Sequence, residues 1–444
     1  MFEWYDYTLY SAFIPVFTQK FFPQFNGNFG SFIAAFGVFA IGYIARPIGG
    51  LLFGYIGDSV SRLFALKMSV WGMTISASLM GLLPTYESVG SLATVLLVLL
   101  RVCQGISIGG EFGSSSAYLV ENAPKGRKNL YGSFVMLSLA AGVTMGSVMF
   151  LIVNFIFTKE ELFNWAWRLP FLFSILLGLI LVKIRSDVKD DNASNNDTDL
   201  INAVDSNNKL HSIQKLKTNS IQGLIKKESK KQKQHTANSF HSQKIKSIWL
   251  DFKRNKKNAL IAFCASLGDG VPFYILTITF SSTLESVLQY SYIRASSVFI
   301  LTMFSYGIAT LLSGFLGDRF STKRMMQIGS LLLCVIPFIS FQAFSVNIFL
   351  VTCVLSCIGG FIVGIYHGSL PYFLLQLFPA ESRTTIMSLT YGVGMAFFGS
   401  TAPMVFYVLL SKFNNWLLLV PLFVSVSSLI AFVAINLQVK RFRC

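Results

Sequence analysis

The stretch GYIGDSVSR runs from Gly54 to Arg62. A second stretch, GFLGDRFSTKR from Gly314 to Arg324, starts in the same way. Both read G-x-x-G-D, both are followed by basic residues, and both lie where a long apolar segment gives way to a polar loop. A motif that recurs at the same place in two halves of a chain predicts a duplicated structural unit.

The composition places the chain in a membrane. Of its 444 residues 53% are hydrophobic and 13% are charged, whereas soluble domains contain about 25% charged residues. The apolar runs are continuous, which excludes the alternating pattern of a transmembrane β-barrel. Because a spanning helix needs roughly 20 apolar residues, we predict an all-α integral membrane protein with twelve transmembrane helices in two six-helix pseudo-repeats. The predicted spans are about 2–18, 29–56, 64–84, 92–119, 132–157, 167–184, 258–284, 294–316, 325–344, 348–374, 386–410 and 416–438.

The net charge of +16 follows the predicted topology. With the N-terminus placed in the cytoplasm, 29 of the 36 lysines and arginines fall on cytoplasmic segments and five near the outer surface. This excess matches the positive-inside rule, so we predict that both termini are cytoplasmic. The charge therefore orients the chain in the membrane, and we expect no nucleic-acid partner.

A polar, low-complexity segment separates the two halves. Between Lys183 and Lys257 it includes DDNASNNDTD and KKESKKQKQH, and it holds 17 of the lysines and arginines. Such a sequence cannot bury enough apolar surface to fold. We predict an N-terminal six-helix bundle over 1–184, a disordered basic cytoplasmic linker over 185–257 and a C-terminal six-helix bundle over 258–444. The linker is either a plain tether or a segment that also contacts anionic lipid.

Five fragments extend the pattern along nearly the whole chain. They are, in order, EWYDYTLY, ARPIGGLLFGYIGD, RVCQGISIGGEFGSSSAYLVENAP, WRLPF and LFPAESRTTIMSLTYGVGMAFFGSTAP. On these motifs the chain resembles the major facilitator superfamily, in particular its metabolite:proton symporter branch, which includes proline/betaine and dicarboxylate transporters. The resemblance implies two parallel repeats with a site at their interface near mid-membrane.

The resemblance also implies a function and a location. We expect proton-coupled import of a small polar metabolite by alternating access, across the cell inner (plasma) membrane. A zwitterionic osmolyte such as proline or betaine is the first substrate class, and a dicarboxylate the second. The expected partners are the substrate, protons and the lipid bilayer, with the chain acting as a monomer.

The sequence departs from the family at two places. The loop after the second span usually reads D-R-x-G-R-K, whereas here it reads DSVSRL from Asp58 to Leu63. The first span, from Phe2 to Thr18, has 17 residues and is about 25 Å long, short of a hydrocarbon core of roughly 30 Å. We therefore expect a truncated first helix or a start further upstream. Both departures support the alternative of a non-transporting or decayed transporter-fold membrane protein, or a sensor.

Carboxylates inside spans are the candidate proton-coupling groups, because intramembrane ionisable residues are costly and usually functional. Glu3 and Asp6 share a helix face at i,i+3 spacing. Arg101 and Glu111 are ten residues apart on the fourth span, at different depths, so they cannot pair directly. We predict proton coupling at Glu3, Asp6 and Glu111. The alternative is a set of static interhelical ion pairs.

Three residues are candidates for substrate binding. Arg101 would hold a substrate carboxylate or orient the site, and the ring of Tyr5 would attract a quaternary ammonium. Asp269 lies in ASLGDGVPFY, where glycines and a proline weaken the helix as in discontinuous transporter helices. Packing is the alternative for Tyr5. His367 is a further titratable group in the tenth span, and a neutral, hydrogen-bonded histidine is the favoured interpretation there.

The resemblance assigns a gating role to the two copies of the G-x-x-G-D motif. It implies that Asp58 and Asp318 meet the positive N-terminus of a helix in the other half when the cytoplasmic side is closed. Arg62 and Arg319 are the basic residues that accompany them. The alternative is that both acids are exposed loop residues.

The sequence gives no sign of a cofactor, a metal site or an enzyme. Cys353 and Cys357 are spaced i,i+4, but further metal ligands are absent nearby, so we expect packing. No phosphate-binding loop is found, which argues against ATP-driven transport. No nucleophile–base spacing supports an enzyme.

Overall fold

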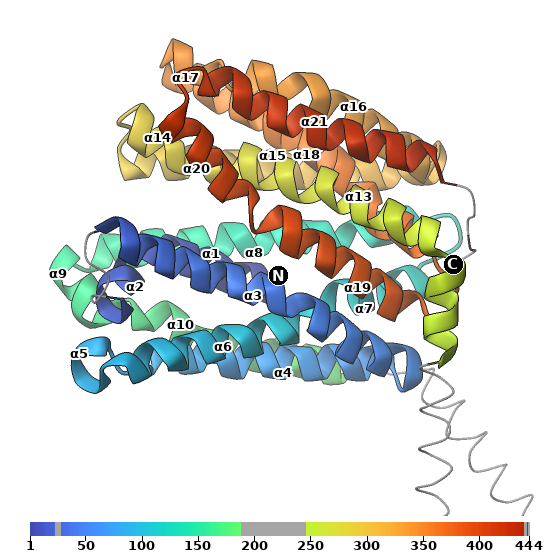
Figure 1. Cartoon of the computed structure of the whole chain (residues 1–444), viewed down its shortest axis with the longest axis horizontal. Coiled ribbons are helices and arrows are strands. Elements are labelled where there is room, and N and C mark those ends of the chain that lie inside the picture. The colour runs from blue at the N-terminus through green and yellow to red at the C-terminus, as the bar shows by residue number, and fades with distance from the viewer. Residues whose placement is uncertain (23–27, 188–245, 439–441, 443–444) are drawn as a thin grey trace, which may run out of the picture.

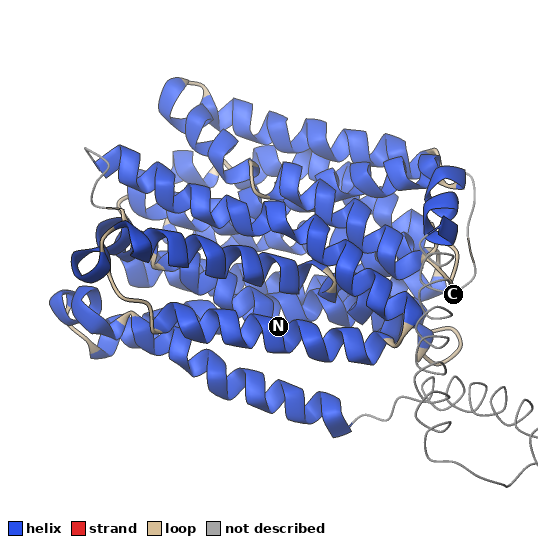
Figure 2. Ribbon diagram, turned by 60° about the horizontal axis from the view of Figure 1, so that its bottom comes forward, coloured by secondary structure: helices blue, strands red, loops and turns tan. Residues whose placement is uncertain are grey.

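The computed structural model describes residues 1–22, 28–187, 246–438 and 442. Nearly all of them are helical, and no strand occurs among them. Figure 1 shows two helical bundles packed against each other, the N-terminal one in blue to green and the C-terminal one in yellow to red. Figure 2 shows the same all-helical architecture from a second direction. The predicted all-α fold is confirmed.

The N-terminal half contains two spans that are broken. The first is interrupted at Phe13, just before Pro15, and the fourth at Gly110, where a Cβ would meet the side chain of Phe53. Both breaks follow from local residues. Pro15 lacks the backbone N–H of a regular helix, and Gly110 stands where a larger residue would not fit. The elements are α1 (Phe2–Ala12), α2 (Ile14–Phe21), α3 (Asn28–Ser59), α4 (Arg62–Gly81), α5 (Tyr86–Val89), α6 (Ser91–Gly109), α7 (Glu111–Glu121), α8 (Lys128–Ile156), α9 (Lys159–Glu161), η1 (Leu162–Ala166) and α10 (Arg168–Asp187).

The C-terminal half contains two spans with a wide π-helical turn. One turn follows Pro272 and the other follows Gly394. The predicted weak point of the seventh span thus exists as a change in helix type. The elements are α13 (Lys256–Phe273), η2 (Tyr274–Thr279), α14 (Phe280–Val287), α15 (Tyr292–Arg319), α16 (Thr322–Ser340), α17 (Ala343–Val346), α18 (Phe349–Leu375), α19 (Arg383–Gly394), η3 (Met395–Gly399), α20 (Ala402–Lys412) and α21 (Trp416–Asn436).

Each predicted span corresponds to one helix or to a broken helix in the structure. Within the described residues, nine helices are long and apolar enough to cross a membrane, or ten if the bent pair Lys159–Ala166 and Arg168–Ile184 is one span. The two other predicted spans are the broken α1–α2 pair and α3, which has 32 residues. The twelve-helix, two-repeat architecture accounts for all of these elements.

The predicted linker differs from the structure at its end. Most of it, 188–245, lies outside the described residues, but 246–254 is helical. The side chain of Ile248 is buried, and Asp251 accepts a hydrogen bond from the hydroxyl of Ser382 at 2.9 Å. Apolar residues inside the basic sequence therefore anchor a helix where the low-complexity pattern predicted disorder.

The helix 246–254, which follows the linker residues 188–245, marks one end of the molecule. In Figure 1 the helix 246–254 crosses the right-hand end of the bundles. We call this end the linker face and the other end the opposite face. The two halves meet along α3 and α19, and along α8, α15 and α18.

Candidate functional site

Asp58 joins the two halves at the linker face. It lies near the end of α3, and its side chain is fully buried. Its carboxylate accepts hydrogen bonds from the backbone N–H of Thr384 at 3.3 Å and of Thr385 at 2.8 Å. The hydroxyl of Thr385 donates a third, at 2.7 Å. These donors are the first turn of α19, so the acid lies at the positive end of a helix from the other half.

Asp318 makes the same kind of contact in the second copy of the motif. It lies near the end of α15, and its carboxylate accepts from the backbone N–H groups of Asn129 at 2.8 Å and Leu130 at 2.9 Å. These residues begin α8, in the N-terminal half. The motif glycines bring the helices close, because a Cβ on Gly54 would lie 2.7 Å from the Cα of Thr385.

The basic residues of the two copies differ. Arg62 donates to Glu121 at 2.6 and 2.9 Å and to Asp58 at 2.8 Å, and Arg383 from the other half lies 3.6 Å from Glu121. Arg319 is exposed and lies 5.2 Å from the ring centroid of Phe315. In the described part of the chain, the Arg319 guanidinium makes no ion pair with the N-terminal half.

A buried charged cluster occupies the N-terminal half. Glu3 forms an ion pair with Arg46 at 3.0 Å, and Asp6 lies 4.0 Å from Arg101. Arg101 also donates to the side chain of Gln104 at 2.6 Å. All four charged side chains are less than a tenth exposed. Each acid predicted on the first span therefore faces a permanently charged arginine from another helix.

Aromatic rings surround the two arginines. The guanidinium carbon of Arg101 lies 3.5 Å from the ring centroid of Tyr10. That of Arg46 lies 4.0 Å from the ring of Tyr43 and 4.8 Å from that of Tyr7. Such cation–π contacts stabilise a desolvated cation by about 2 kcal/mol. The rings thus help to keep both charges inside the protein.

Glu111 begins α7, directly after the break at Gly110. It is partly buried and acts electrostatically on Glu3, so it belongs to the same charged region. The small residues around it allow close packing. A Cβ on Gly109 would meet the backbone of Arg46, and one on Gly113 would meet Ser388 of the other half.

A second buried polar cluster lies in the C-terminal half around Asp269. Its carboxylate accepts the hydroxyl of Tyr391 at 2.7 Å and lies 2.5 Å from Nε2 of His367. Nδ1 of His367 is 2.8 Å from the hydroxyl of Tyr306. All four side chains are less than a tenth exposed. Three helices, α15, α18 and α19, thus supply the polar groups that surround an acid on α13.

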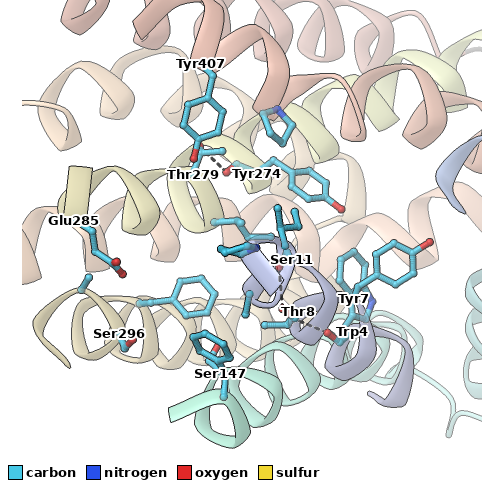
Figure 3. Close-up of a pocket in the computed structure, with 18 of the residues that line it drawn as sticks. Trp4, Tyr7, Thr8, Ser11, Ser147, Tyr274, Thr279, Glu285, Ser296 and Tyr407 are labelled. Atoms are coloured by element: carbon cyan, nitrogen blue, oxygen red, sulfur yellow. Dashed lines mark hydrogen bonds between the residues drawn. The ribbon is translucent and has the colours of Figure 1, made fainter. Parts of the chain in front are cut away.

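A cavity of about 450 Å³ lies between the two halves (Figure 3). Its polar groups include the hydroxyls of Tyr43 and Tyr274, which form a hydrogen bond across the interface. Glu285 lines it from α14. The lining is Trp4, Tyr7, Thr8, Ser11, Ala12, Ile14, Pro15, Tyr43, Ser147, Phe150, Tyr274, Ile278, Thr279, Glu285, Ala295, Ser296, Phe299, Pro403 and Tyr407. Elements α2, α14 and α20 place it toward the opposite face (Figure 1).

The predicted substrate residues lie outside this lining. Tyr5 is fully buried, and its hydroxyl donates to the backbone carbonyl of Pro170 at 2.9 Å, which is a packing contact. Arg101 lies behind the ring of Tyr7, which does line the cavity. Asp269 lies in the second cluster, not among the lining residues. The structure thus gathers Glu3, Asp6, Arg101 and Glu111 in one region and leaves Tyr5 and Asp269 outside it.

The sequence prediction missed three features of the site. Arg46 is the partner of Glu3, and its position within a span was the available signal. Tyr43 and Tyr274 meet across the halves, which no local pattern indicates. The partnership of His367 with Asp269 was also missed, although both were singled out separately.

Comparison with known proteins gives the family. Residues 1–257 match the family described as "Sugar (and other) transporter". Residues 258–441 match the one described as "Major Facilitator Superfamily". The chain belongs to the major facilitator superfamily. As a member it is a multi-pass membrane transporter, and this superfamily is not one of enzymes.

Relatives of this superfamily member are named as transporters of metabolites, of proline/betaine and of shikimate. It is 30% identical to the inner membrane metabolite transport protein YhjE of Escherichia coli (strain K12), over 90% of this chain and 83% of the relative. It is 27% identical to a putative proline/betaine transporter of Staphylococcus aureus (strain MSSA476), over 92% and 80%. Identity with the shikimate transporter of Escherichia coli (strain K12) is 38%, but the match spans only 42% of this chain and 43% of that relative.

Solved structures of the superfamily share the fold. The proton:xylose symporter XylE bound to 6-bromo-6-deoxy-D-glucose superposes with a TM-score of 0.74, covering 99% of this chain and 93% of that one. An inward open conformation of XylE from E. coli superposes with a TM-score of 0.64. Sequence identity is 16% in both, so the likeness concerns the fold of the transporter alone.

Proposed function

We propose that this transporter imports a small polar metabolite together with protons by alternating access. The observation that carries the proposal is the buried charged cluster beside the cavity between the halves. Glu3 and Asp6 face Arg46 and Arg101 there, and Tyr7 and Tyr43 connect this cluster to the cavity wall. Charges at this depth are costly and are kept where they serve transport.

The two ends of the molecule support a direction. Asp58 and Asp318 hold the halves together at the linker face, while the cavity lies toward the opposite face. We assign the linker face to the cytoplasm of a cell with this protein in its inner (plasma) membrane, in agreement with the basic residues there. The structure then corresponds to a state that receives substrate from outside, and Asp58, Arg62 and Asp318 act as the cytoplasmic gate.

Protonation of the carboxylates provides the coupling. Glu3, Asp6 and Glu111 lie in one region, and two arginines balance part of their charge. A proton on one carboxyl frees its arginine to attract the carboxylate of a substrate. Release of that proton toward the cytoplasm restores the ion pair and favours substrate release.

A zwitterionic osmolyte such as proline or betaine fits the cavity best, and a dicarboxylate is the second candidate. The rings of Trp4, Tyr7, Tyr43 and Tyr274 suit a quaternary or secondary ammonium. Arg46, directly behind Tyr43, suits its carboxylate. The volume of about 450 Å³ is within the range of small-molecule sites. The name of the proline/betaine relative supports this order.

Uptake by proteoliposomes tests the proposal. Purified protein is reconstituted and supplied with radiolabelled proline, betaine, shikimate or a dicarboxylate, with and without an imposed pH gradient. We expect accumulation of at least one substrate that depends on an acidic exterior. Absence of uptake of every substrate by folded protein would support the alternative, a transporter fold that does not transport.

A further inference from the structure

Apart from Asp58 at the linker face, three acidic residues are buried within the described residues: Glu3, Asp6 and Asp269. The first two face arginines, whose guanidinium groups stay charged at any physiological pH. Asp269 differs, because its cationic partner is His367, at 2.5 Å, and no lysine or arginine of the described chain lies within 4.0 Å of it. Asp269 and His367 therefore form the one buried ion pair, among these residues, in which both partners can change charge.

The hydrogen bonds around the pair fit two protonation states. When His367 is neutral, Nε2–H faces Asp269 and Nδ1 accepts the hydroxyl proton of Tyr306. When a proton from water is added at Nδ1, the imidazolium donates to the oxygen of Tyr306, whose hydroxyl turns away. Tyr391 donates to Asp269 in both states. The net charge of the pair changes from −1 to 0, and no heavy atom has to move.

The groups that face the pair from neighbouring elements are mostly tyrosines. They are Tyr306 from α15, Tyr366 from α18 and Tyr391 from α19, and the hydroxyl of Tyr366 is held by the carbonyl of Ala265. The sequences of α21 and η3 contain no ionisable residue. Cys264 acts electrostatically on Tyr366, and Glu3 and Arg46 act on Tyr391. Among the described residues, no lysine or arginine pairs directly with Asp269 in place of a protonated His367.

We infer that the Asp269–His367 pair is a proton-binding site in the C-terminal half, separate from the carboxylates of the first and fourth spans. The inference rests on the proposed function for the use of this proton in transport. It assigns Asp269 to proton binding instead of substrate binding. A chain with both sites moves one more proton per substrate than the first cluster alone provides.

Two neighbours give the pair a means of acting on transport. The ring of Phe273 lies 5.6 Å from that of His367 and 5.8 Å from that of Trp4, which lines the cavity. Asp269 precedes Pro272 and the π-helical turn of η2, where the helix of the seventh span is weakest. Neutralising the pair therefore changes the charge next to the π-helical turn that borders the cavity.

Nuclear magnetic resonance of a single histidine tests proton binding directly. The chain has four histidines, so replacing His211, His235 and His241 by Asn leaves His367 as the sole ¹⁵N-labelled imidazole. In lipid nanodiscs we expect its ¹⁵N shifts to change between neutral and charged forms from pH 5 to pH 9. An imidazole that keeps one form over this whole range in folded protein would overturn the inference.

The Asp269→Asn variant provides the matched comparison. Loss of the negative charge removes the partner of the imidazolium, so the ¹⁵N shifts of His367 should depend on pH differently from those of the unmodified chain. An unchanged pH dependence would show that the two groups do not form one site. If this variant does not fold, Tyr306→Phe, which removes the hydroxyl at Nδ1, serves for the same measurement.

The proton-to-substrate ratio connects the site to transport. In proteoliposomes the His367→Gln variant, which has no imidazole to protonate, should move one proton fewer per substrate than the unmodified chain. An unchanged ratio, although His367 titrates in the unmodified chain, would overturn the role in transport. If the unmodified chain shows no proton-coupled uptake, the proposed function fails, while the histidine titration still decides whether the pair binds a proton.

Discussion

The carboxylate of Asp58 accepts both the backbone N–H and the hydroxyl of Thr385, at 2.8 and 2.7 Å, across the interface between the two halves. In the proposed alternating-access cycle, this contact closes the linker face and has to break each time the protein opens there. The same holds for Asp318 and the start of α8. The strength of these contacts therefore sets how often the transporter opens on this side.

Asp58→Asn should open the linker face. The charge at a helix N-terminus stabilises the contact by about 1–2 kcal/mol, so its loss lowers the closed population by about five- to thirty-fold. Spin labels at the exposed residues Val60 and Phe320, in a chain without native cysteines, report the distance between the halves. Arg319→Gln is the control and should leave that distance unchanged. An unaltered distance distribution in Asp58→Asn would contradict the gating role.

Gly54→Ala should destabilise the closed interface, because the new Cβ would lie 2.7 Å from the Cα of Thr385. Overpacking of this kind costs about 1–3 kcal/mol. Gly37→Ala on the same helix is the matched control, since no heavy atom lies within 4 Å of its new Cβ. Thermal unfolding in detergent should show a lower midpoint for the Gly54 variant only. Equal midpoints would show that the interface is looser than these contacts indicate.

Glu111→Gln keeps the shape and hydrogen-bonding capacity of the side chain and removes its titration. We expect uphill, pH-gradient-driven uptake to be lost while folding and substrate exchange persist. Uptake and melting temperature are measured on the same preparation. Concentrative, proton-dependent uptake by the folded variant would show that Glu111 is not a coupling group.

Arg101→Lys keeps the charge but removes the planar guanidinium that stacks on Tyr10 and donates to Gln104. Because these contacts are fully buried, we expect a loss of about 2 kcal/mol of stability. We also expect a large loss of uptake, because the site beside Asp6 is disturbed. If uptake falls and the melting temperature does not, Arg101 acts on the substrate and not on the packing.

Tyr43→Phe removes a hydroxyl that lines the cavity and bonds to Tyr274. One hydrogen bond is worth about 1 kcal/mol, so the KM for substrate should rise about five-fold. Tyr5→Phe is the matched control, because it loses an equally buried hydrogen bond, to Pro170, away from the cavity. It should lower stability and leave KM unchanged. Similar KM values for both variants would place the substrate elsewhere.

The sequence predicted the helices well, and the family resemblance predicted the kind of partner that Asp58 contacts. Continuous apolar runs determine where helices lie in a membrane, so every predicted span has its helix. The motif around Asp58 predicted a contact with a helix N-terminus, and Thr384 and Thr385 provide it. Local sequence was sufficient for the helices, whereas the contact of Asp58 with residues of the other half was implied by the family resemblance.

The substrate residues were harder to predict, because transmembrane helices are apolar on all sides. Nothing in the first span distinguishes Tyr5, which packs on Pro170, from Tyr7, which lines the cavity. The pairing of Glu3 with Arg46, and of Asp269 with His367, depends on how separate helices rotate against each other. Only the assembled bundle determines that rotation.

The two copies of the G-x-x-G-D motif make unequal contacts, and this affects how the two halves separate. Beside Asp58, Arg383 of one half lies 3.6 Å from Glu121 of the other. Beside Asp318, Lys323 donates to the carbonyl of Asn436 in its own half, and Arg127 of the N-terminal half acts on the carboxylate electrostatically, without an ion pair among the described residues. We therefore expect the halves to separate unevenly, first where α15 meets α8 and later where α3 meets α19.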